Sequence, residues 1–249
     1  MMRSRVRRTS RFSSDEGITL IELLVAVVLL GVFLTVISGL YVSAMKTVAL
    51  GRELTGSSKQ VSTAMLETSR VIRAATENPL PAGGSDPAFV VAKDNEILLY
   101  AYINLASSLE QPVMIRLRVD TATGNYIESR WPAQALTNGK WKFDINPCFS
   151  PGVPVGCAAP TTYRTIAATV APYVSGDPVF RYLQADGSCV PVSATVSTCA
   201  SNLTDVQRRL VASVRVTLTL QPTLTDNSNP VTVINTVGIP NLGFPKMGP

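Results

Sequence analysis

The chain has 249 residues, is 46% hydrophobic and carries a formal net charge of +5, with no histidine. Residues 1–17 hold five of the 22 basic residues and two of the 17 acidic ones, which leaves 17 and 15 in the rest. Most of the excess of basic over acidic residues therefore lies in this short segment, which is poor evidence for nucleic-acid binding. The lack of histidine removes the most frequent general base and a common zinc ligand.

A long apolar segment follows the arginine-rich front. Residues 18–45 contain a single charged side chain, that of Glu22. A helix needs about 20 apolar residues to cross a bilayer, so this segment is long enough to span one. Because basic flanks stay in the cytoplasm, we expect a short basic tail inside and the remaining chain outside. Glu22 needs an explanation, since a charge at the centre of a membrane helix costs about 2.5–3.5 kcal/mol on insertion scales.

Three interpretations of this N-terminus compete. A secretory signal peptide would fit the basic front and the small residues Val42-Ser43-Ala44 as a cleavage site. The apolar run is longer than in most signal peptides, however, and it contains an acid. An uncleaved membrane anchor is the second interpretation, and it leaves Glu22 without a purpose. The third interpretation accounts for both the acid and the glycine that precedes the apolar run.

The stretch Gly17-Ile18-Thr19-Leu20-Ile21-Glu22 resembles the N-terminal signal of type IV pilins and type II secretion pseudopilins. The resemblance implies that a prepilin peptidase cuts between Gly17 and Ile18, removes residues 1–17 as a leader peptide and methylates the new N-terminus. Glu22 would become the fifth residue of the processed chain, where this family keeps a glutamate. Ile18 departs from the phenylalanine or methionine that is commoner there, which makes its methylation less certain than the cut.

The same resemblance implies where the protein resides and what it contacts. It implies a single-pass protein of the inner membrane with its head outside, which then enters a cell-surface or periplasmic filament. The implied partners are other pilins or pseudopilins, through their N-terminal helices, together with the prepilin peptidase and the inner-membrane assembly platform. The sequence leaves open whether nucleic acid is bound.

Glu22 has a physical role in this interpretation. Cleavage would create an ammonium at Ile18, one helical turn from Glu22 on the same face, and the helix dipole favours an anion in the first turn. In the family the acid pairs with the N-terminal amine of a neighbouring subunit. Within an apolar filament core such a pair is far better than either charge alone, so Glu22 would fix the register of assembly. The alternative is a snorkelling or protonated carboxyl group at the membrane interface.

The helix is predicted to continue beyond the apolar segment. No proline occurs between Gly17 and Pro79, and the sequence predicts a helix over residues 18–76. Its first part, 18–45, is apolar all round and would form the transmembrane and filament-core helix. In its second part, within 46–78, apolar and polar residues recur at helical spacing on opposite faces, which indicates an amphipathic half.

Residues 79–249 are predicted to form an extracytoplasmic, β-rich head. After residue 86 the apolar period changes to two, with a turn at Asp94-Asn95. The segment 113–120 alternates apolar residues with Arg116, Arg118 and Asp120, so the two arginines indicate a solvated strand face or, less simply, a basic binding patch. The segment 212–220 alternates in the same way. The fold class is therefore α+β, with a long N-terminal transmembrane helix whose amphipathic half packs on an antiparallel sheet.

The middle of the head, from about residue 131 to 205, is loop-rich and contains all four cysteines. Four cysteines allow three pairings, and the near-neighbour one would join Cys148 to Cys157 and Cys189 to Cys199. Paired cysteines beyond a membrane segment suggest an oxidising exterior. Their spacing does not match a metal site.

The order of elements, the size and the phrases "VFRYLQADG" and "VQRRLVASVRVTL" resemble the larger J-type pseudopilins and the W-type minor pilins. The large head with its loop-rich middle predicts a low-copy subunit near the filament tip, where it would prime assembly, because a free end accommodates such a head most easily. A large-headed major pilin is the alternative.

Enzymatic interpretations have little support in the sequence. It contains no nucleophile elbow, P-loop or dinucleotide fingerprint, and its acids are scattered singly, although a carboxylate-only hydrolase remains open. We expect no enzymatic activity, no cofactor and no bound metal. A signal-anchored adhesin or receptor that acts alone is the other functional class, but it would not need Gly17 or Glu22. Whether the filament would be a pilus or a secretion pseudopilus is not encoded in any motif.

Overall fold

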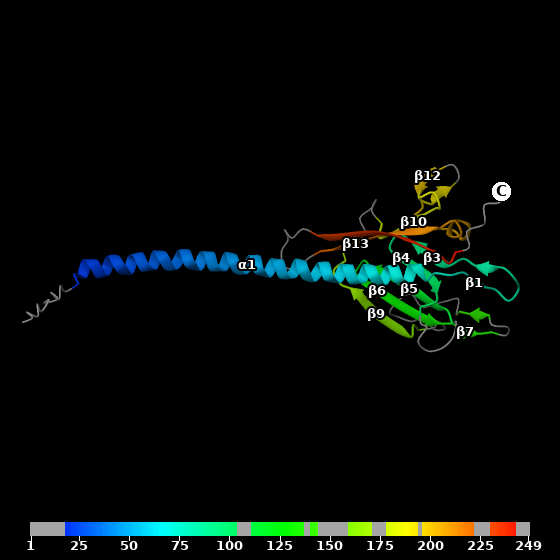
Figure 1. Cartoon of the computed structure of the whole chain (residues 1–249), viewed down its shortest axis with the longest axis horizontal. Coiled ribbons are helices and arrows are strands. Elements are labelled where there is room, and N and C mark those ends of the chain that lie inside the picture. The colour runs from blue at the N-terminus through cyan, green and yellow to red at the C-terminus, as the bar shows by residue number, and fades with distance from the viewer. Residues whose placement is uncertain are drawn as a thin grey trace, which may run out of the picture. The chain divides into compact units, whose positions relative to one another are not determined.

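The structure is a computed structural model that describes residues 18–103, 111–136, 140–143, 159–170, 178–193, 196–221 and 230–242. The chain divides into two compact units, Met1–Ala49 and Leu50–Pro249, which are described separately. One long helix, α1, begins in the first unit and ends in the second, and antiparallel sheets follow it (Figure 1). The α+β class predicted from the sequence is confirmed.

Helix α1 spans Leu20–Arg73 without interruption, as 54 residues. It begins two residues after the predicted start and ends three residues before the predicted end. Beyond Arg73 the backbone leaves the helix because the amide of Thr76 donates to the carbonyl of Tyr100 at 2.9 Å, and Ala75 forms a bridge with Ala101. Residues 74–77 contain no proline or glycine, so pairing with a strand, and not a helix-breaking residue, ends the helix here.

In the first unit, α1 has exposed side chains on every side. By length and composition it is a helix that could cross a membrane. In the second unit the same helix buries one face, formed by Val61, Ala64, Met65, Thr68, Ser69, Val71 and Ile72. The residues between them remain exposed or half-buried, so the predicted change from an all-round apolar helix to a one-sided one is confirmed.

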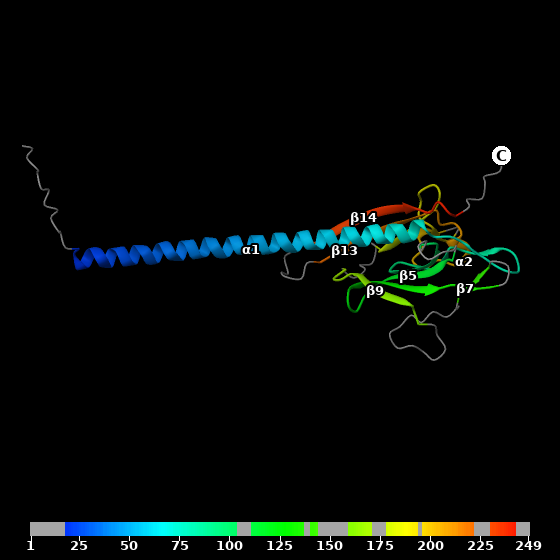
Figure 2. The same cartoon turned by 60° about the horizontal axis from the view of Figure 1, so that its bottom comes forward.

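The larger sheet has five antiparallel strands in the order β3-β4-β5-β6-β9. Their bounds are Phe89–Lys93, Glu96–Ala101, Val113–Asp120, Asn125–Pro132 and Thr162–Ala167. The predicted turn at Asp94-Asn95 joins β3 to β4. Figure 2 shows this sheet on one side of the final turns of α1, with β14 on the other.

The second sheet has three antiparallel strands in the order β10-β13-β14. Their bounds are Phe180–Leu183, Ser213–Leu220 and Val231–Gly238. The predicted alternation in β13 is confirmed, since Val214, Val216, Leu218 and Leu220 are all buried. Three short hairpins and one short helix complete the described head: β1–β2 (Asn78–Pro79, Ser85–Asp86), β7–β8 (Gln134–Ala135, Trp141–Lys142), β11–β12 (Pro191–Ser193, Val196–Cys199) and α2 (Asp205–Arg208).

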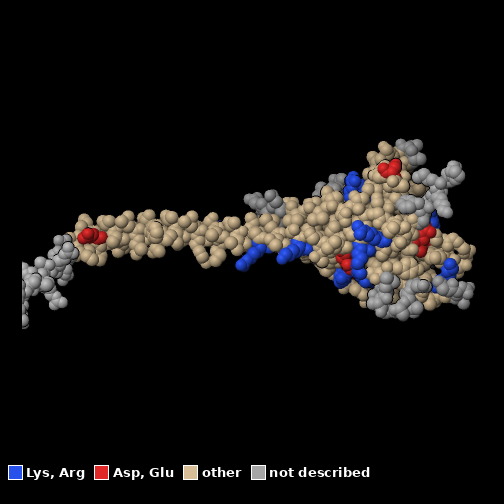
Figure 3. Space-filling view, in the orientation of Figure 1, with Lys and Arg blue, Asp and Glu red and all other residues tan. Residues whose placement is uncertain are grey.

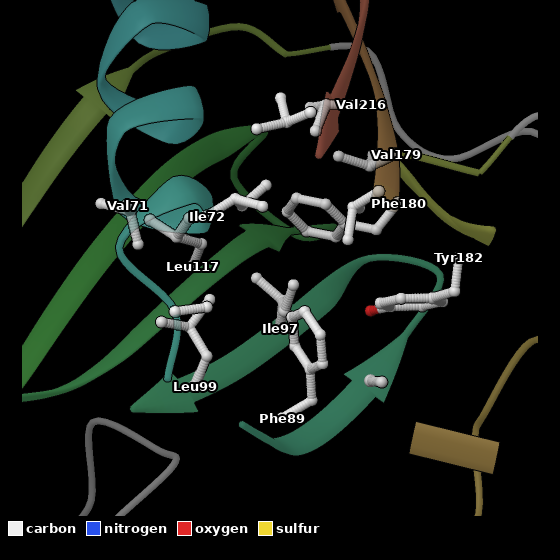
Figure 4. Close-up of a cluster of buried hydrophobic side chains, with 14 of the residues drawn as sticks. Val71, Ile72, Phe89, Ile97, Leu99, Leu117, Val179, Phe180, Tyr182 and Val216 are labelled. Atoms are coloured by element: carbon white, nitrogen blue, oxygen red, sulfur yellow. The ribbon is translucent and has the colours of Figure 1, made fainter. Parts of the chain in front are cut away.

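The helix and both sheets share one hydrophobic core. Figure 4 shows Ile72 of α1, Leu117 of the larger sheet and Phe180 of the smaller sheet pointing into the same cluster. All three side chains are fully buried. Burying a side chain of this size contributes about 1.5–3 kcal/mol, so the amphipathic half of α1 is an integral part of the head.

The opposite face of the larger sheet carries a second apolar cluster. Its buried members are Leu98, Tyr100, Met114, Trp131, Ala133 and Phe143. Burial raises the pKa of Tyr100 to about 12, because the charged phenolate is disfavoured away from water. The loop-rich middle of the head therefore contributes side chains to a small core of its own.

Arg116 shares that covered face, and the predicted solvated strand face or basic patch is wrong for this residue. Its side chain is only 8% exposed, and its Nε donates to Glu96 Oε1 at 2.6 Å. Burial lowers the pKa of Arg116, while the partner carboxylate opposes that shift. Arg118 is half-buried, and its Nη2 lies 4.0 Å from Asp120 Oδ1. The predicted alternation of β5 is confirmed, but the face that carries Arg116 is covered by other parts of the chain and does not meet water.

A cluster of ions fastens α1 to the larger sheet. Glu67 of α1 and the fully buried Glu128 of β6 are both bound by Arg164 of β9, with 2.8 Å between Arg164 Nη2 and Glu128 Oε2. Arg130 also contacts both carboxylates, and Arg70 pairs with Glu67 at 2.8 Å. Figure 3 shows basic atoms beside acidic atoms on this face of the head. The buried Glu128 carboxylate thus has the cationic partners that a buried charge requires, and the half-buried Glu67 carboxylate shares them.

This cluster predicts acid sensitivity of the head. The hydrogen bond from Arg70, opposed by burial and helped by Arg164, lowers the pKa of Glu67 below its ordinary value of 4.5. The stabilisation is therefore present above pH 4.5 and is lost as the pH falls through the folded-state pKa. We expect Glu67→Gln to lower the free energy of unfolding at pH 7 by about 1 kcal/mol and to flatten its decline in acid. Chemical denaturation at several pH values measures this, and an unchanged pH slope would contradict it.

Candidate assembly site at the start of the helix

The first turn of α1 is capped by its own side chains. The amide of Glu22 donates to the carbonyl of Thr19 at 3.0 Å and makes a longer contact, 3.4 Å, with its hydroxyl. The Thr19 hydroxyl in turn lies 3.5 Å from Glu22 Oε2. A threonine followed three residues later by a glutamate is the sequence pattern of a capping box, which satisfies amides that the helix leaves unpaired.

Thr19 was not among the predicted site residues, although the capping pattern in the sequence indicates its contact with Glu22. The cap also holds the Glu22 carboxylate at the start of the helix, where the macrodipole favours an anion. Ile18 and Thr19 precede the first helical residue, and Ile18 is exposed. The backbone on the C-terminal side of the predicted cut is therefore outside the helix, while Gly17 itself lies outside the described residues.

Glu22 lies on an otherwise apolar face. Ile18, Glu22, Leu23, Ala26, Val27 and Leu30 line one shallow hollow on the helix surface. The spacing of four residues from Ile18 to Glu22, Ala26 and Leu30 places these side chains on one side of the helix. Figure 3 shows acidic atoms at the start of the described helix and uncharged surface along the apolar segment after them. This surface offers one carboxylate surrounded by hydrocarbon, which suits pairing with a cation that arrives together with an apolar partner.

The remaining predicted site residues are cysteines. Cys189 and Cys199 form a disulfide that closes the β11–β12 hairpin, with 5.4 Å between their Cα atoms. Cys148 and Cys157 lie outside the described residues. Gln207 of α2 donates to the carbonyls of Pro191 at 2.7 Å and Val192 at 2.9 Å, which supports the same hairpin. Within the described part of the chain, no group of three or more acidic or cysteine residues could hold a metal ion.

The disulfide predicts a measurable contribution to stability. It closes a loop with a sequence separation of 10 residues, for which the chain-entropy model gives about 2–3 kcal/mol. We expect the paired substitution Cys189→Ser with Cys199→Ser to lower the free energy of unfolding of the exported protein by that amount. Non-reducing peptide mapping of the unsubstituted protein is the control. A Cys189-containing peptide bonded to Cys148 or Cys157 would contradict the local pairing.

Comparison with known protein families finds a match to the segment just described. Residues 13–38 match the model for the prokaryotic N-terminal methylation motif. Comparison with curated proteins finds no match. The match contains the predicted cleavage point, Glu22 and the apolar face around it.

Together these findings support one class of protein. The motif and the long apolar helix followed by an antiparallel β head support a subunit of the type IV pilin and pseudopilin type. A motif of this type implies processing by a prepilin peptidase, assembly with other pilins and attachment to a membrane through the N-terminal helix. Proteins with this motif are structural rather than enzymatic. The narrower resemblance to J-type or W-type subunits rests on sequence alone.

Proposed function

We propose that this chain is a minor pilin or pseudopilin, a structural subunit of a type IV pilus or of a type II secretion-like filament. The observation that carries the proposal is the methylation motif at residues 13–38, which contains the start of an exposed apolar helix with Glu22 in its first turn. The capped first turn supports a defined position for that carboxylate. An ordinary membrane anchor would need neither feature.

In the proposed mechanism the prepilin peptidase removes residues 1–17 and exposes an ammonium group on Ile18, which it then methylates. The protein remains in the inner membrane through residues 18–45, with its head outside. The Glu22 carboxylate then pairs with the N-terminal ammonium of a neighbouring subunit as both helices enter the filament. Leaving either charge unpaired in that apolar core would be costly, so only one register of the two helices is favoured.

We further propose that the subunit lies near the filament tip and primes assembly. Heads in the shaft of a filament must pack against identical neighbours on several sides, which favours compact shapes. The head of this chain, residues 79–249, carries a disulfide-closed hairpin with exposed Val192 and Val196 in addition to its two sheets. Such a projection is easiest to place at a free end, where exposed loops also tend to carry binding functions.

Quantitative mass spectrometry of sheared filaments tests this proposal. We expect peptides of this chain to be present at a small fraction of the most abundant pilin, and deletion of the chain to reduce the number of filaments rather than their width. A share comparable to that of the most abundant pilin would overturn the tip position. Complete absence from filaments of every kind would overturn the proposed function itself.

A further inference from the structure

Strand β14 lies at the edge of the three-stranded sheet, and alternate residues of it turn their backbone groups away from β13. The amide of Thr217 in β13 donates toward β10, to Val179 at 2.9 Å, whereas the amide of Ile239 donates to Ala212 at the β13 side. Because these directions alternate along a strand, the register of β13 with β14 assigns the outward direction to every second residue. The outward-facing residues are Thr232, Ile234, Thr236 and Gly238.

The backbone groups on this edge are unpaired, which distinguishes it from the edges formed by β3 and β10. The amide and carbonyl groups of these four residues have no backbone hydrogen-bond partner among the described residues. By contrast, β3 is covered by bonds from Leu203 to Ala92 and from Asp94 to Ser201, and β10 is covered by a bond from Val190 to Tyr182. The edge strand β9 carries Arg164, which belongs to the ion cluster.

The side chains of β14 also lack the usual protection against edge-to-edge pairing. Residues 231–238 contain no charged residue and no proline, which are the common devices for blocking a strand edge. The strand is also held in register, because Asn235 Nδ2 donates to Ser69 Oγ at 3.0 Å and the hydroxyls of Thr219 and Thr232 lie 2.9 Å apart. On its outer side Ile234 is 61% exposed. The edge is therefore an ordered template for another strand.

The direction of β14 restricts what can pair with it. Its contacts with α1 advance along both elements, from Asn235 with Ser69 to Asn241 with Arg73, so β14 runs in the same sense as α1. Two copies paired through β14 in an antiparallel, two-fold arrangement would have their helices pointing in opposite senses. Subunits inserted in one membrane share a single orientation, which excludes this antiparallel pairing of two β14 strands.

We propose that β14 pairs edge to edge with an extended, uncharged strand in the head of a neighbouring pilin-type subunit. The identity of the partner rests on the proposed function, while the open edge stands on the backbone geometry. Main-chain hydrogen bonds supply the binding, and the small or β-branched side chains Thr232, Ile234 and Thr236 select a strand of matching character.

The test uses the full-length chain in its native membrane, with a photo-crosslinking amino acid at Thr236. A matched control places the same group at Arg215, which is also exposed but lies on β13, one strand away from the edge. The decisive variant adds Ile234→Pro, which removes an outward amide and leaves the bonds to β13 intact, as proline is tolerated on a free edge. We expect a crosslink from Thr236 to a pilin-type protein and little crosslinking from Arg215. The Ile234→Pro substitution should abolish the crosslink from Thr236 and leave the melting temperature of the protein unchanged.

Several outcomes would overturn the proposal. A crosslink from Thr236 to residues 222–229 or 243–249 of the same chain would mean that the chain covers its own edge, and a crosslink to a protein of another class would remove the pilin-type partner. If the chain enters filaments normally but gives no crosslink, or one that Ile234→Pro leaves intact, the edge inference alone fails. If the chain is absent from filaments, the proposed function fails with it.

Discussion

Replacing Glu22 with valine should leave membrane insertion and leader removal intact and should abolish entry of the chain into filaments. The substitution makes the helix more apolar, so insertion is not impaired. It also removes the only charge on the face that contains Ala26 and Leu30. A neighbouring ammonium would then be buried without a partner, which costs about 3–5 kcal/mol, or a loss of more than a hundredfold in the assembly equilibrium.

Two further variants separate charge from shape at this position. Glu22→Gln keeps the shape of the side chain and removes its charge, so it should fail nearly as completely as valine. Glu22→Asp keeps the charge on a shorter side chain and should retain part of the function. The measurement is the ratio of this chain in sheared filaments to this chain in membranes, determined by immunoblotting. A normal ratio for Glu22→Val would rule out a role of the carboxylate in fixing register.

The second large effect is expected at Gly17. Replacing Gly17 with leucine should leave the precursor uncut, because in the proposed processing the peptidase would recognise the glycine immediately before the apolar helix. The uncut chain would keep five arginines on the cytoplasmic side, each worth about 1 kcal/mol of attraction to an anionic membrane surface, which opposes its withdrawal into a filament. Precursor and processed chain are separated by gel mobility or intact mass.

The control for Gly17 is Ser10→Leu, which adds the same side chain to the leader outside the matched motif. We expect that variant to be processed normally. Efficient cleavage of the Gly17→Leu chain at the same bond would show that the glycine is not read, and it would weaken the pilin-type interpretation of the whole N-terminus.

The helix and the regular strands could be predicted because their signals are local. The period of 3.6 residues in the second half of α1 and the period of two in β13 each arise because the apolar side chains face one core, whereas the first half of α1 is recognised by its unbroken apolar run. Thr19 could also have been predicted, since it lies three residues before Glu22 in a capping pattern. The end of the helix was less accessible, because the bond between Thr76 and Tyr100 that terminates it joins two elements.

The polar contacts of the head could not be predicted from periodicity. Arg116 alternates correctly for a solvated strand face, yet that face is occupied by a second cluster containing Trp131 and Phe143. Likewise, Glu67 and Glu128 are far apart in the sequence and are brought together in the fold, where Arg130 and Arg164 each contact both. The alternation of residues in a strand indicates which side chains share a face. Whether that face is exposed to solvent depends on the tertiary fold.

The identity of the N-terminal residue tests the central claim most directly. Mass spectrometry of the N-terminal peptide, taken from protein extracted from membranes and filaments, gives that residue without any substitution. We expect a chain that begins at Ile18, with a methyl group on its amine. A chain that begins at Met45 would identify an ordinary signal peptide, and one that retains residues 1–17 would identify an uncleaved anchor. Either result would contradict a pilin-type subunit.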